Sequence, residues 1–130
     1  MNLEGAVTWA FEFEDQPYFA GFRSLATNGI DKPVMNVFRM FSKMDSDRLP
    51  VTSDSKIPLP EILRSGVRKK PDVSAFASLS GKKLSVLVWH YHDDDLPGPD
   101  AAINLKIPNL PVAIGQAKVT HYRVDETHGN

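Results

Sequence analysis

The stretch AVTWAFEF, residues 6–13, decides how the N-terminal third of the chain is interpreted. It is rich in β-branched and aromatic residues that alternate in part with other residues, which predicts a β-strand. Because successive side chains of a strand point to opposite faces, Glu12 and Glu14 are expected on one face and the aromatic residues on the other. A strand needs a neighbour to pair with, so the residues that follow determine where it belongs.

A long loop and then a helix follow this strand. Residues 15–30, DQPYFAGFRSLATNGI, contain several breakers, including Asn28-Gly29, and predict a loop long enough to have a function. Asp31 is the expected N-cap and Pro33 lies near the first helical position. Apolar residues then recur at helical spacing and predict an amphipathic helix of about three turns. These residues are Val34, Val37, Phe38, Phe41 and Met44.

The remainder of the chain has the character of an all-β module. Residues 45–60 are polar and contain three prolines, with a short strand expected around 49–52. Four further strands are predicted at residues 73–79, 84–91, 102–107 and 118–124. The turn SGKK, residues 80–83, joins the first two as a hairpin, and the strand at 84–91 is apolar on both faces and expected to be central. Short strands at regular spacing favour a β-sandwich.

Composition excludes several classes of function. The chain has 130 residues, a formal net charge of -1 and no cysteine. The balanced charge lacks the basic character of a nucleic-acid binder, and the absence of cysteine rules out disulfides and zinc–thiolate sites. No window approaches the roughly 20 apolar residues that span a bilayer, and the N-terminus lacks the basic start of a signal peptide. We therefore expect neither a nucleic-acid nor a membrane partner.

Glu12 and Glu14 are the first candidates for chemistry. At this spacing on a strand their Cα atoms are roughly 6.5–7 Å apart, within the range of about 5–9.5 Å that paired carboxylates use in glycoside hydrolysis. Nearby aromatic residues such as Trp9 and Tyr18 could stack on sugar faces. On spacing alone, the favoured interpretation is that both glutamates line the solvent side of an ordinary strand.

A second group of polar residues follows the strand at 84–91. His90 and His92 would project to the same side of a strand, and a carboxylate from Asp93–Asp95 could complete a divalent-metal site. No third ligand is fixed by the spacing, and aspartates commonly accept backbone N–H groups in turns, so the structural interpretation is favoured. The basic residues 68–70 are interpreted as a solvated loop. We expect no metal and no cofactor.

Two long stretches resemble a known family. Residues 9–44, WAFEFEDQPYFAGFRSLATNGIDKPVMNVFRMFSKM, resemble the last strand, active-site loop and last helix of the (β/α)8 TIM barrel in glycoside hydrolase family 39, the β-xylosidase and α-L-iduronidase family. The stretches PDVSAFAS (71–78), LSVLVWHYHDDDLPGP (84–99) and VTHYRVDETHGN (119–130) are similar to the β-sandwich that follows the barrel in its bacterial β-xylosidases. The resemblance implies a mainly β fold: a last barrel unit at residues 1–44 and an incomplete β-sandwich at 45–130.

The resemblance also implies a function and its residues. Members of this family are retaining enzymes whose two catalytic glutamates lie about 5 Å apart, on the fourth and seventh barrel strands. Both would lie upstream of Met1, so no catalytic residue is expected here and the isolated chain is expected to be inactive. A carboxylate from the final loop contacts the sugar in the −1 subsite; by position this role goes to Glu14, with Glu12 second and Trp9 in the subsite wall.

The expected substrate is a xylo-oligosaccharide or another glycoside, and the expected partner is the missing N-terminal part of the barrel. The compartment stays open, with the bacterial cytoplasm or periplasm as options for the parent enzyme. Two alternatives also stay open: a non-catalytic carbohydrate-binding β-sandwich and a purely structural module.

Overall fold

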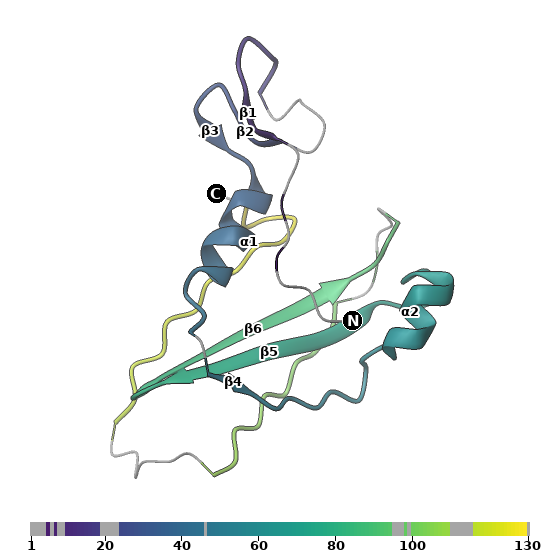
Figure 1. The fold of residues 1–130 in the computed structure, drawn as a ribbon, viewed down its shortest axis with the longest axis vertical. Helices are drawn as coiled ribbons and strands as arrows, with labels where there is room; N and C mark the ends of the chain where they lie inside the picture. The colour runs from purple at the N-terminus through teal and green to yellow at the C-terminus, as the bar shows by residue number, and fades with distance from the viewer. Residues whose placement is uncertain are drawn as a thin grey trace. The chain divides into compact units, whose positions relative to one another are not determined.

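The chain forms two compact units in the computed structural model (Figure 1). The structure describes residues 5, 7, 10–18, 24–45, 47–94, 98, 100–109 and 116–129. Residues 1–43 and 119–130 form the first unit, and residues 44–118 form the second. The described residues contain two three-stranded sheets and two short helices, a mixed and mainly strand fold. They show neither a barrel nor a sandwich. None of their helices is long and apolar enough to cross a membrane.

The first unit contains a small mixed sheet. Its strands are β1 (Ala10–Phe13), β2 (Ser24–Thr27) and β3 (Ile30–Asp31), in the order β1-β2-β3. The strand predicted at 6–13 is confirmed over the residues of β1. Strands β1 and β2 are parallel, with Glu12 opposite Ala26, whereas β2 and β3 are antiparallel. All four residues of β2 are buried, so β2 supplies the core of this unit.

The loop predicted over residues 15–30 is therefore wrong for β2 and for Ile30. Asn28 and Gly29 have φ angles of 49° and 75°. Positive φ at both central residues is the signature of the type I′ turn that closes a tight hairpin, here between Thr27 and Ile30. The dipeptide thus joins β2 to β3. Because it was interpreted from the sequence only as a breaker, neither strand was predicted.

The helix predicted after residue 31 is confirmed as α1 (Pro33–Phe41), which contacts β2 and β3. Pro33 begins the helix, where its missing N–H costs nothing. The expected cap is wrong: the N-cap residue is Lys32, and the Asp31 carboxylate instead pairs with Arg39 at 2.5 Å. The helix ends before Met44, which falls outside it. Val34 and Phe38 remain exposed, so part of the apolar stripe of α1 faces solvent.

The second unit is built on an antiparallel sheet. It contains β4 (Arg48–Leu49), β5 (Asp72–Ser80) and β6 (Lys83–Tyr91), in the order β4-β5-β6. The predicted hairpin is confirmed: β5 and β6 pair along their full length, and Gly81 adopts the positive φ of the turn. The prediction that the strand at 84–91 is central is wrong, because β5 is the central strand of this sheet and β6 lies at its edge. The apolar residues of β6 are half-buried or exposed, as an edge position requires.

Three other predictions for the second half of the sequence need correction. Helix α2 (Leu59–Ser65) was not expected, because prolines suggested irregular structure. Proline is tolerated in the first turn of a helix, where Pro60 of α2 lies; Pro58 is the N-cap residue and Gly66 the C-cap residue. The strands predicted at 102–107 and 118–124 are absent from the described residues of these ranges. The apolar residues of 102–107 alternate but stay exposed, since alternation alone does not supply a partner strand. In 118–124, Val119 and Tyr122 are exposed as well.

Candidate functional site

The two glutamates of the sequence prediction lie at the carboxyl end of β1 in different surroundings. Glu12 belongs to the strand, is half-buried, and accepts a hydrogen bond from the backbone N–H of Gly29 through Oε1. Glu14 follows the strand in a bend and is exposed. Glu12 is thus bound to the β2–β3 turn, whereas the carboxylate of Glu14 faces solvent.

A second contact fixes the segment after β1 onto the same turn. The side-chain Nδ2 of Asn28 donates a hydrogen bond to the backbone oxygen of Gln16. Together with the Glu12–Gly29 bond, this contact holds residues 12–16 against the turn. Tyr18, a little further on, has 62% of its surface exposed. An exposed carboxylate can accept hydrogen bonds from hydroxyl groups, and an exposed ring can stack on an apolar face.

Two parts of the predicted site stay predictions. Trp9 lies outside the described residues. Glu14 lies beyond the end of β1, so the alternation of a strand does not determine on which face its side chain lies relative to Glu12.

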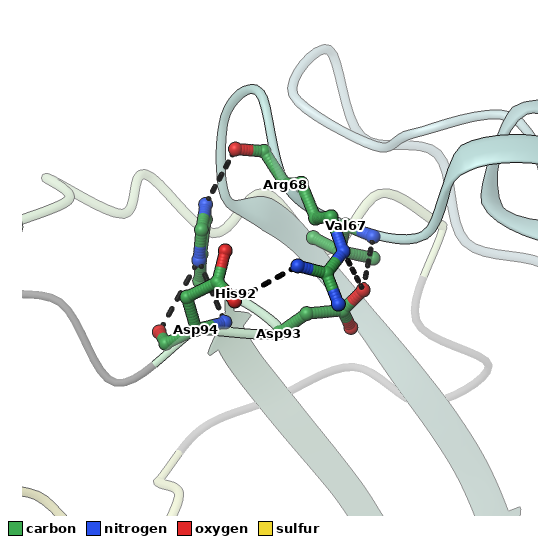
Figure 2. A network of polar contacts seen from close by, with 5 residues as sticks. All are labelled: Val67, Arg68, His92, Asp93 and Asp94. Carbon is green, nitrogen blue, oxygen red and sulfur yellow. Dashed lines mark hydrogen bonds and ion pairs between the residues drawn. The ribbon is translucent and has the colours of Figure 1, made fainter.

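The polar residues after β6 form a network that Figure 2 shows from close by. His92 Nδ1 accepts the backbone N–H of Asp94 at 3.0 Å, which leaves the ring proton on Nε2 to donate to the backbone oxygen of Arg68 at 2.9 Å. Asp93 accepts the N–H of Val67 at 2.8 Å and returns its own N–H to the Val67 oxygen at 2.9 Å. The Arg68 guanidinium contacts Asp94 at 3.1 Å.

This network joins the segment after α2 to the segment after β6. Both ring nitrogens of His92 are engaged with backbone groups, and Asp93 is engaged with the backbone as well. His90 is exposed on β6. Over the part of the chain that the structure describes, no three histidine or carboxylate side chains gather as metal ligands would. The geometry suits a structural role in closing the end of the second unit.

Asp72 is a buried charged residue that the sequence prediction missed. Its Oδ1 accepts the backbone N–H of Ile57 and its Oδ2 accepts the indole N–H of Trp89, both at 2.7 Å. The Trp89 ring packs on Phe76, with ring centroids 4.8 Å apart. Asp72 lies directly before the strand predicted at residues 73–79, and a carboxylate next to an apolar strand was the available signal.

A polar turn near the C-terminus was also missed. Asp125 Oδ1 accepts the N–H groups of Thr127 and His128, each at 2.9 Å, and lies 2.8 Å from His128 Nδ1. The hydrogen bond from His128 is the main cause that holds the pKa of Asp125 well below its usual range. Desolvation opposes this effect, and the hydrogen bonds from Thr127 and the charge of Arg123 lower the pKa further.

This turn borders a groove of about 820 Å³ along α1. Asn36 on the helix donates a hydrogen bond to the backbone oxygen of Gly129 at 2.7 Å, and Lys43 lies over the ring of Tyr122. The arginines that line the groove are already engaged: Arg39 with Asp31 and Arg123 with Asp125. Both arginines of the groove are therefore neutralised by aspartates.

The carboxyl end of β1 is accordingly the candidate site, with Glu14 as its exposed carboxylate and Glu12 as the residue that holds the adjoining turn. Comparison with protein-family models, with curated proteins and with solved structures gives no match to this chain.

Proposed function

We propose that this chain is the C-terminal segment of a retaining glycoside hydrolase of family 39, which releases xylose from β-1,4-xylo-oligosaccharides. In this proposal β1 and α1 belong to the last unit of a (β/α)8 barrel, and residues 45–130 belong to the β-sandwich that follows it, although residues 119–130 lie in the same compact unit as β1 and α1. The observation that carries the proposal is the exposed Glu14 carboxylate at the carboxyl end of β1, within a stretch that resembles the final active-site loop of that family.

The surroundings of the two glutamates support their proposed order. Active sites of (β/α)8 barrels lie at the carboxyl ends of the strands. Both glutamates lie at that end of β1, but Glu12 already accepts a hydrogen bond from Gly29. Glu14 is therefore the better candidate to accept a hydrogen bond from a sugar hydroxyl, and Glu12 comes second, as a residue that supports the loop.

The surface of α1 also supports a larger assembly. Val34 and Phe38 lie four residues apart on one side of the helix and are 43% and 46% exposed. An amphipathic helix normally buries its apolar stripe. In the proposal this stripe packs against other elements of the barrel.

The chemistry would be shared between this chain and the upstream barrel units. One upstream glutamate would act as the nucleophile and the other as the acid and base. Glu14 would accept a hydrogen bond from the sugar in the −1 subsite and so orient it. A hydrogen bond that strengthens as the transition state forms raises the rate, whereas one of constant strength only improves binding. The proposal involves no cofactor.

Complementation tests this proposal. The isolated chain is assayed with a nitrophenyl β-xyloside, and then again after mixing with the first seven βα units of a family 39 β-xylosidase. We expect no turnover from the chain alone and measurable turnover from the mixture. Glu14→Gln should lower that turnover about tenfold or more, since a hydrogen bond to a charged group contributes about 1.5–3 kcal/mol. Glu126→Gln, an exposed glutamate of the C-terminal turn, is the matched control and should have no effect.

Two results would overturn the proposal. The first is turnover by the isolated chain that Glu12→Gln or Glu14→Gln abolishes, because the catalytic pair would then lie in this chain. The second is a mixture that stays inactive, or one in which Glu14→Gln leaves the turnover unchanged.

A non-catalytic carbohydrate-binding module is the second candidate. The exposed ring of Tyr18, close in sequence to Glu14, favours it, because sugar sites combine a ring with polar groups. Titration calorimetry with xylobiose separates the two candidates. Saturable binding by the isolated chain that Tyr18→Ala abolishes, together with failed complementation, would favour the module.

A further inference from the structure

The turn between β2 and β3 contains a chemically labile dipeptide. In Asn28-Gly29 the glycine has no side chain to shield its backbone nitrogen, so this nitrogen can attack the side-chain carbonyl carbon of the preceding asparagine. Both residues are exposed, so water and hydroxide reach them. Burial therefore does not protect this site, so any protection must come from its hydrogen bonds and from the conformation of the turn.

Both reacting groups are held by residues of β1 and of the segment that follows it. The asparagine side chain donates to the backbone oxygen of Gln16, and the Gly29 N–H donates to the carboxylate of Glu12. We propose that Asn28-Gly29 is a latent deamidation site that Glu12 keeps unreactive while β1 stays paired with β2. This inference does not depend on the proposed glycosidase function.

The reaction in question is a cyclisation followed by hydrolysis. The Gly29 nitrogen loses its proton to hydroxide and forms a bond to Asn28 Cγ. The bond from Cγ to Nδ2 then breaks, and Nδ2 takes up a proton from water and leaves as ammonia. Water opens the resulting succinimide at either carbonyl, giving aspartate or isoaspartate. The net change consumes one water and releases one ammonia, with no oxidant or reductant.

Glu12 opposes the first step for two reasons. The proton that must leave Gly29 is the one that its carboxylate binds. The negative charge of the carboxylate also disfavours the negative charge that develops on the nitrogen, as any neighbouring like charge does. The hairpin adds a conformational restraint, because the pair Thr27–Ile30 fixes the type I′ turn and Gln16 holds the side chain that must rotate.

Deamidation would in turn damage the site. Aspartate or isoaspartate at position 28 places a new carboxylate close to Glu12, and isoaspartate also lengthens the backbone by one carbon within a two-residue turn. Repulsion between the carboxylates and the altered turn would both release residues 12–16 from the β2–β3 turn. The deamidation rate of Asn28 would thus indicate whether residues 12–16 are bound to the β2–β3 turn.

The test measures the deamidation rate of Asn28 in the full chain at mildly alkaline pH, by peptide mapping and mass spectrometry. The folded chain is compared with the same chain in urea and with three variants: Glu12→Ala, Glu12→Gln and, as the matched control, Glu14→Gln. We expect the folded chain to react about tenfold or more slowly than the chain in urea, as the loss of one hydrogen bond to a charged group implies. Glu12→Ala should approach the rate in urea, Glu12→Gln should lie between, and Glu14→Gln should match the parent chain.

Amide hydrogen exchange of Leu25 and Ala26 shows whether each variant keeps β2 folded. If Glu12→Ala loses this protection, Glu12→Gln decides the question, because it retains an oxygen acceptor and removes only the charge. The proposal is overturned if the folded parent chain reacts as fast as the chain in urea, or if a folded Glu12 variant reacts no faster than Glu14→Gln.

Discussion

The Asp72 carboxylate is expected to be the most sensitive single position in the second unit. It is only 7% exposed and accepts two hydrogen bonds of 2.7 Å, from the Ile57 N–H and the Trp89 indole. A hydrogen bond to a charged group contributes about 1.5–3 kcal/mol, and the loss of one partner leaves the other unsatisfied. Asp72→Ala should therefore lower the free energy of unfolding by roughly 3–5 kcal/mol, a large part of the 5–15 kcal/mol typical of a domain.

A double-mutant cycle isolates the Asp72–Trp89 bond. Trp89→Phe removes the indole N–H but keeps an aromatic ring where Trp89 packs on Phe76. The cycle Asp72→Ala with Trp89→Phe should give a coupling energy of about 1–3 kcal/mol. The free energies come from urea unfolding of the full chain. Circular dichroism monitors the unfolding, because the loss of a tryptophan would alter a fluorescence signal.

Asp54→Ala is the matched control for this cycle. Asp54 is exposed, and within the described part of the chain its side chain accepts a hydrogen bond only from its neighbour Ser55. Asp54→Ala should therefore change the free energy of unfolding by less than about 0.5 kcal/mol. The reasoning is refuted if Asp72→Ala costs no more than Asp54→Ala. A coupling energy below about 0.5 kcal/mol would refute it as well, because independent sites show that much non-additivity.

Two further predictions concern the turns. Gly66→Ala should destabilise the chain by more than about 1 kcal/mol, because Gly66 has a φ of 67° and a Cβ there would lie 2.2 Å from Asp93 Oδ2; Gly81→Ala, with a φ of 55° and open space, should cost less in the same urea titration. Because the pKa of Asp125 is lowered on folding, its contribution to stability is present above the usual aspartate pKa and is lost as the pH falls through the lowered value. NMR of the Asp125 carboxyl carbon should follow this titration, and the pKa of Asp125 should be higher in the His128→Ala variant than in the parent chain.

The elements that the sequence predicted well are those with local signals. The hairpin of β5 and β6 is visible in alternating residues around Gly81, and its two strands are neighbours in the chain. Helix α1 is visible in the spacing of its apolar residues and in Pro33 at its start. In both cases the interactions that define the element connect residues a few positions apart.

The elements that the sequence missed depend on distant partners. Strand β2 is buried because it pairs with β1, which lies fourteen positions earlier at the pair Ala10–Ser24. Conversely, residues 102–107 have the alternation of a strand but form none, because a pattern predicts a face and not a neighbour. Parallel pairing leaves little trace in a single sequence, since both strands must be known before either is recognised.

The candidate site shows the same division. The sequence places both glutamates at the end of a strand, but the contact that distinguishes them joins Glu12 to a residue 17 positions away. The role of Asp72 escaped prediction for a similar reason, because Trp89 is also 17 positions away. Residue type and spacing identify which groups are able to react, whereas the fold decides which of them are already engaged.

Because Glu12 and Glu14 have different proposed roles, the two proposals can be tested separately. Glu14→Gln should change turnover in the complemented enzyme and leave the deamidation of Asn28 unchanged. Glu12→Gln should speed deamidation and should lower turnover only as far as release of the turn displaces Glu14. If Glu12→Gln lowered turnover without faster deamidation, Glu12 would contact the sugar and would not hold the turn. The order of the two residues in the subsite would then be reversed.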